Sequence, residues 1–130
     1  MAKPSSGAIR TAEQKIRQAE WGIANQSHET AIVFDKDGTE LMRIDGDESS
    51  VSLSKEFLAH AKGAIVTHNH PVEGVSVFSS SDIRSDGLML PAEARMVTKQ
   101  GQLDKMVYNS KFSKDKARLL ANRVESFEKA

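Results

Sequence analysis

Residues 66–83 have the sequence VTHNHPVEGVSVFSSSDI, which combines the end of a strand, two histidines and the start of a helix. The run that leads into it, Ala64-Ile65-Val66-Thr67, has no polar alternation at its start, as expected of a buried central strand. Pro71 cannot donate a hydrogen bond to a sheet, so the strand should end there. Ser79 or Ser80 can then cap a short helix that begins near Asp82. The stretch therefore predicts a strand, a loop and a helix.

The two histidines lie two positions apart on the expected strand. Residues i and i+2 of a strand point to the same face, so His68 and His70 can share one ion while Asn69 points away. Asp82, at the start of the next helix, can return as a third ligand. Two imidazoles and one carboxylate hold catalytic zinc and leave one position open for water. The sequence therefore predicts a zinc site in a small metal-dependent hydrolase.

A hydrolase of this kind also needs a general base that is not itself a ligand. Glu29 is the expected base, because it comes directly before an apolar strand, where an acidic side chain is unusual. Glu40, on the returning strand of the same hairpin, is its rival. Ser79 is expected to donate a hydrogen bond to the oxyanion that forms when water attacks a carbonyl.

The flanking sequence predicts alternating helices and hairpins. Upstream, a capping box of Thr11 and Gln14 starts a helix over residues 12–25, a hairpin joins residues 30–34 to 39–44, and Ser54 caps a helix that Gly63 ends. Residues 51–53 form either a short strand or a lead-in to that helix. Downstream, a second hairpin joins residues 94–98 to 103–108, and a helix follows over residues 113–128. The expected fold class is α/β, with a mixed β-sheet flanked by helices.

Length and composition limit the alternatives. The chain has 130 residues, which predicts a single domain over residues 11–130 after a disordered segment, residues 1–10. Lysine plus arginine equals aspartate plus glutamate at 18 each, which gives no support to a general nucleic-acid or membrane-surface binder. There is no cysteine, so a metal must be held by histidine and carboxylate. Without a secretory signal or a membrane-spanning run, a cytoplasmic location is expected, and a domain of a larger protein is equally compatible.

The order His68-Asn69-His70-Pro71 followed by FSSSDI resembles the JAMM signature of the JAB/MPN metalloenzymes: a distant glutamate, then His-x-His-Pro, then Ser-x-x-Asp. The wording is most similar to RadC-type proteins and to JAB-like domains of phage proteins and bacterial toxins. The resemblance implies a JAB/MPN (cytidine-deaminase-like) fold, zinc bound by His68, His70 and Asp82, Ser79 at the oxyanion and Glu29 as the base. It also implies a peptide or isopeptide substrate. Separately, the many charges of the first and last helices suit packing against a partner protein or the rest of a longer protein.

Other interpretations stay open. The interval from His70 to Asp82 is one residue longer than the family pattern, which favours a binding or assembly module of a phage protein or toxin with weak or no catalysis. A zinc-dependent nuclease would keep the ligands and change the substrate. The histidines could instead bond to backbone, Asp82 could serve only the helix dipole, Ser79 could be only a cap, and Glu29 could be an exposed charge at a strand edge.

Overall fold

A computed structural model describes residues 10–71 and 78–128 of the chain. The predicted disordered segment lies outside the described residues apart from Arg10. The element order is α1 (Ala12–Ala24), β1 (Thr30–Phe34), β2 (Glu40–Asp45), α2 (Lys55–Ala61), β3 (Ile65–His70), α3 (Ser80–Met89), β4 (Glu93–Thr98), β5 (Leu103–Val107) and α4 (Lys114–Glu128). The α/β class and the mixed sheet predicted from the sequence are confirmed.

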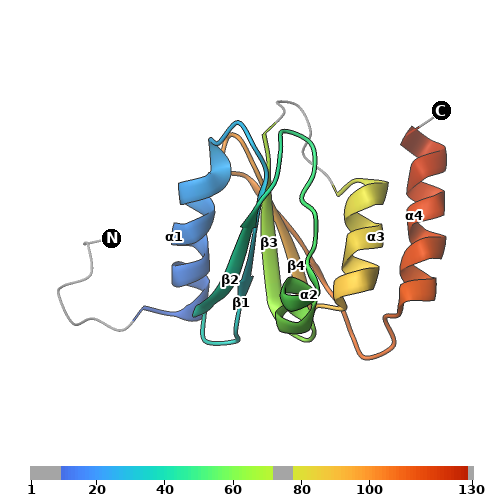
Figure 1. Ribbon diagram of the computed structural model, residues 1–130, viewed down its shortest axis with the longest axis horizontal. Helices are drawn as coiled ribbons and strands as arrows, with labels where there is room; N and C mark the ends of the chain where they lie inside the picture. Colours follow the sequence, from blue (N-terminus) through green and yellow to red (C-terminus); the bar gives the residue numbers. More distant parts are fainter. Residues whose placement is uncertain (1–9, 72–77, 129–130) are drawn as a thin grey trace.

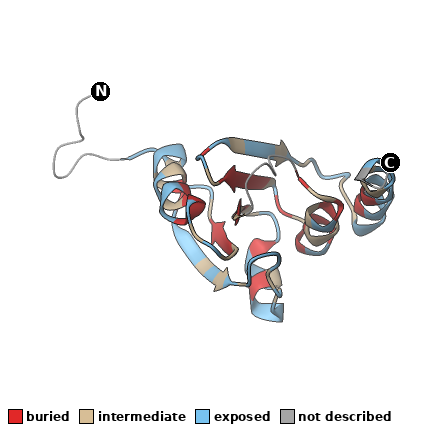
Figure 2. Cartoon of the chain, turned by 90° about the horizontal axis from the view of Figure 1, so that it is seen from above, coloured by how far each residue is buried: buried red, intermediate tan, exposed pale blue. Residues whose placement is uncertain are grey.

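The strands form one sheet in the order β2-β1-β3-β4-β5. The pairs β1–β2, β1–β3 and β4–β5 are antiparallel, whereas β3 and β4 run parallel and are connected through α3. The histidine-bearing strand β3 is therefore central, as its apolar sequence predicted. The middle strands are buried along most of their length, and the edge strands β2 and β5 are largely exposed (Figure 2).

Helices cover both faces of the sheet (Figure 1). Helix α1 packs on one face, where Ile16 and Ile23 meet Ile32 and Phe34 of β1. Helices α2 and α3 lie on the other face, where Phe57 meets the alternate residues of β1. Helix α4 packs on the outer side of α3. The alternation along β1 and β3 therefore separates an α1 face from an α2/α3 face, and the site lies on the second.

A buried ion network fastens α1 to the sheet. The side chains of Arg95 on β4 and Glu20 on α1 are both fully buried, and Arg95 Nε donates to Glu20 Oε2 at 2.8 Å. Thr67 of β3 donates its hydroxyl to the same carboxylate oxygen at 2.7 Å. Glu13 and Glu93 complete the set of carboxylates around the guanidinium. This network occupies the face of the sheet opposite the predicted metal ligands.

Most local predictions match the structure; one helix start is corrected, and the alternative left open for residues 51–53 is decided. The capping box of Thr11 and Gln14 and the cap by Ser54 are both present. Helix α3 begins at Ser80 rather than near Asp82, because Ser79 is its N-cap. Residues 51–53 form no strand, so they are a lead-in to α2. Within the described residues, no helix has the length and apolar character needed to cross a bilayer.

Candidate metal centre

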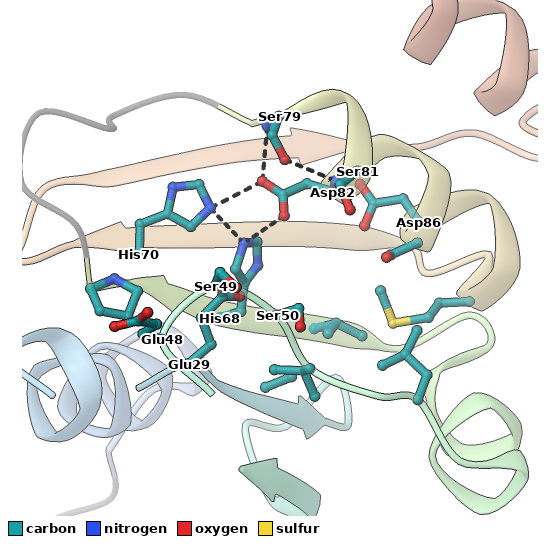
Figure 3. A pocket seen from close by; sticks show the side chains of 17 residues that line it. Glu29, Glu48, Ser49, Ser50, His68, His70, Ser79, Ser81, Asp82 and Asp86 are labelled. Carbon is teal, nitrogen blue, oxygen red and sulfur yellow. Dashed lines mark hydrogen bonds and ion pairs between the residues drawn. The ribbon is translucent and has the colours of Figure 1, made fainter. Parts of the chain in front are cut away.

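His68, His70 and Asp82 converge on one point (Figure 3). His68 Nε2 and His70 Nε2 lie 3.0 Å apart. His70 Nε2 is 3.0 Å from Asp82 Oδ2, and His68 Nε2 is 3.2 Å from Asp82 Oδ1. The structure thus brings together the three side chains that the sequence analysis selected.

Each ligand is held by regular structure. His68 and His70 occupy alternate positions of β3, and both point to the α2/α3 face. Asp82 is the third residue of α3 and belongs to a capping box: Ser79 N–H donates to Asp82 Oδ2 at 2.9 Å, and Asp82 N–H donates to Ser79 Oγ at 3.1 Å. The carboxylate is therefore oriented by the helix start before any ion is considered.

The spacing of these atoms is short enough for one metal ion. Zinc bonds of about 2.0–2.1 Å to nitrogen and oxygen place neighbouring ligand atoms roughly 3.3 Å apart in a tetrahedron. The two imidazole nitrogens lie 3.0 Å apart, and they lie 3.0 and 3.2 Å from the two different oxygens of the Asp82 carboxylate. His70 is 6% exposed, and its buried Nδ1 has no hydrogen-bond partner among the described residues. The group could hold a metal ion through these three residues.

The electrostatics of the group suit a cation. Burial raises the pKa of Asp82, but hydrogen bonds with His68 and His70 outweigh it and hold that pKa well below its ordinary value. Burial lowers the pKa of His68, whereas the hydrogen bond and charge of Asp82 raise it, and the net result is a pKa above the usual value. Asp82 is thus an anion across the physiological range, as a metal ligand must be.

Glu29 lines the same cavity as the three ligands. This cavity, of about 260 Å³, lies between β3, α3 and the segment after β2. Glu29 is partly buried just before β1, and Figure 3 shows it on the His68 side of the group. Burial raises its pKa, the charge of His68 opposes this, and the pKa stays above its ordinary value. A raised carboxyl pKa is suited to a group that takes and returns a proton.

Glu40, the alternative candidate for the general base, does not line the cavity. Glu40 is exposed on β2 and is paired with Arg43 at 2.7 Å, and it is not among the residues that line the cavity. Glu48, which the sequence analysis missed, does line it, from an exposed position in the segment after β2. Only the pairing of that segment with residue 29 brings Glu48 near, and no local motif marks such a pairing.

Ser79 is placed for both of the roles considered for it, as a helix cap and as a hydrogen-bond donor to the oxyanion. Its hydroxyl oxygen accepts the Asp82 N–H, so it is the helix cap. A serine hydroxyl that accepts one hydrogen bond still has its own proton to donate. Ser79 also lines the cavity, and Figure 3 places it on the far side of Asp82 from Glu29. The capping role is confirmed, and the oxyanion role stays a prediction.

The deeper part of the cavity is apolar with one buried acid. Asp86, one helical turn after Asp82, is 3% exposed and accepts the Tyr108 hydroxyl at 2.6 Å. The apolar wall comes from Ala31, Val51, Leu53, Val66 and Met89. Among the described residues, no lysine or arginine lines the cavity; its charged side chains besides the histidines are Glu29, Glu48, Asp82 and Asp86.

The other two histidines lie outside the site. His28 is 3.3 Å from Asp45, and His60 is exposed on α2. Neither lines the cavity.

Comparison of the chain with protein-family models, with curated proteins and with solved structures found no match.

Proposed function

We propose that this chain is a zinc-dependent hydrolase of peptide or isopeptide bonds with a JAB/MPN-type fold. The observation that carries the proposal is the meeting of His68, His70 and Asp82 in the cavity that Glu29 also lines. A ligand group alone would support metal binding. The additional carboxylate, partly buried and with a raised pKa, supports catalysis.

The chemistry divides among few residues. His68, His70 and Asp82 would hold zinc, which supplies a Lewis acid that makes water acidic enough to react near neutral pH. Glu29 would take a proton from the attacking water and later give it to the leaving amine. The Ser79 hydroxyl would donate a hydrogen bond to the substrate carbonyl oxygen as that oxygen gains negative charge.

The lining of the cavity supports an amide rather than a phosphodiester substrate. Its acidic side chains besides the proposed ligand Asp82 are Glu29, Glu48 and Asp86, and among the described residues no lysine or arginine lines it that could pair with a phosphate. A neutral amide carbonyl needs no such partner. We therefore favour an amide substrate over the nuclease alternative.

Metal content tests the ligand assignment. We expect the purified protein to carry about one zinc per chain by mass spectrometry, because three protein ligands define one site. His68→Ala combined with His70→Ala should abolish binding, whereas the exposed His60→Ala, as the matched control, should keep it. Full zinc content in the double variant would disprove the site.

Hydrolysis tests the role of Glu29. A panel of linear and lysine-linked peptides, with products identified by mass spectrometry, is the assay. Glu29→Gln should keep its zinc and lose about 10²–10⁴-fold in rate, the usual contribution of a general base. Glu40→Gln, at the exposed rival position, should hydrolyse like the unmodified protein. An unchanged rate in Glu29→Gln would contradict the base assignment.

The same assay decides for or against the alternative function. The interval between His70 and Asp82 is one residue longer than the JAB/MPN pattern, which favours a binding or assembly module. Such a module would bind zinc through the same residues, and its zinc-loaded form would leave every peptide of the panel intact. Cleavage that depends on both zinc and Glu29 would exclude it.

A further inference from the structure

We propose that Asn69 is a positioning residue that fixes Glu29 relative to the two metal-binding histidines. The inference rests on the proposed function, in which Glu29 is the base. Asn69 stands between His68 and His70, but its side chain lies on the opposite face of β3. It can therefore act on the site only through another residue.

The side chain of Asn69 holds both neighbours of Glu29. Asn69 is 0% exposed. Its Oδ1 accepts the backbone N–H of Thr30 at 2.6 Å, and its Nδ2 donates to the backbone carbonyl of His28 at 2.9 Å. One amide group therefore spans the backbone on either side of the base.

Glu29 itself is held from the other direction. Its backbone N–H donates to the Asp47 carbonyl at 2.7 Å, and its carbonyl accepts the Gly46 N–H at 2.7 Å. The regular pairing of β1 with β3 ends at Ala31 opposite His68. Beyond that pair, the Asn69 side chain provides hydrogen bonds from β3 to the backbone on either side of Glu29. Any shift of the histidine strand is thereby passed on to the base.

The chemistry of this link calls for an amide. The link uses one acceptor for Thr30 and one donor for His28, and the asparagine side chain supplies both. Alanine supplies neither. Leucine has a similar volume and no charge, and it also supplies neither. These two substitutions therefore remove the link with and without leaving a cavity.

Thr67→Val is the matched control. Thr67 lies two positions earlier on the same strand and the same face, and it is also fully buried. Its hydroxyl donates to Glu20 on α1 at 2.7 Å, away from residues 28–30. This variant removes a buried hydrogen bond of β3 while leaving the backbone around Glu29 in place.

Cobalt provides a readout that needs no substrate. Co²⁺ can be loaded in place of zinc, and its visible spectrum would change with pH where a water bound to it, or the neighbouring Glu29, loses a proton. Glu29→Gln should shift the midpoint of this change. Asn69→Ala and Asn69→Leu should both shift it in the same direction while keeping one cobalt per chain. Thr67→Val should leave the midpoint unmoved. If Asn69→Ala fails to fold by circular dichroism, Asn69→Leu carries the test.

The double variant Glu29→Gln with Asn69→Ala shows whether Asn69 acts through Glu29. Its midpoint should equal that of Glu29→Gln alone, because a positioning residue has no further effect once its target is gone. An unshifted midpoint in the asparagine variants, or additive shifts in the double variant, would overturn the positioning role alone. Failure of the unmodified protein to bind cobalt would instead overturn the metal site and, with it, both proposals.

Discussion

Asp86 is a carboxylic acid in surroundings that disfavour its charge. Burial raises its pKa to about 7, although the hydrogen bond from Tyr108 acts in the opposite direction. In the unfolded chain the same group loses its proton near its ordinary pKa of 3.8. Between these two values the folded protein binds a proton that the unfolded chain has released. Stability must therefore fall as the pH rises through this window.

Asp86→Asn should remove this pH dependence while still accepting the hydrogen bond from Tyr108. We expect the two proteins to have similar free energies of unfolding near pH 4. By pH 8 the variant should be more stable by at least about 1 kcal/mol, since one pKa unit corresponds to about 1.4 kcal/mol. Urea denaturation across this range, with EDTA present throughout, measures the difference. The exposed Asp104→Asn is the control, and parallel curves for all three proteins would refute the assignment.

At the scale of single residues, the sequence predicts those site residues whose arrangement depends on neighbours a few positions away. His68 and His70 share a face because strands alternate, and Asp82 returns because Ser79 starts a helix; both inferences are local. Asp86 and Glu48 were missed. Nothing in the sequence near them shows that the segment after β2 and the second turn of α3 line one cavity.

Helices α3 and α4 approach closely at a glycine. A Cβ atom on Gly87 would lie 2.5 Å from Ala117 Cβ, well inside contact distance. Ala117 is fully buried, so it cannot turn aside. This contact fixes the distance between the helix that carries Asp82 and the helix that covers it.

Gly87→Ala should therefore destabilise the protein by about 1–3 kcal/mol, despite the higher helix propensity of alanine. Adding Ala117→Gly should recover much of the loss, because it removes the opposing Cβ. Gly22→Ala on α1 is the control: no atom lies within 4 Å of its added Cβ, so it should stabilise by up to about 1 kcal/mol. Thermal melts give the comparison, and a stabilising Gly87→Ala would show that the helices separate without cost.

At the scale of helices and strands, the correct predictions rest on turn residues and helix-capping residues. The two hairpins follow from polar turns between β-rich runs, and three helix starts follow from Thr11, Ser54 and Ser79. The sheet order could not be predicted in the same way. That β1 pairs with β3 and carries Glu29 to the histidines depends on contacts between distant residues, which local periodicity does not record.

At the scale of the whole molecule, the candidate metal centre joins the central strand to α3. A ligand that binds only the folded chain stabilises it by mass action, by about 4 kcal/mol at a thousandfold excess over its dissociation constant. Removing zinc with EDTA should therefore lower the melting temperature by on the order of 10 °C. Asp82→Asn should melt at the same temperature with and without EDTA. An EDTA effect of equal size in that variant would place the metal elsewhere.

The pairing of Ala31 with His68 also limits insertions and deletions in the chain close to the candidate metal centre. One residue inserted between Glu29 and Ala31 would turn the carboxylate to the opposite face of the sheet, and two would move it about 7 Å along the strand. Insertions and deletions should therefore be excluded just before β1.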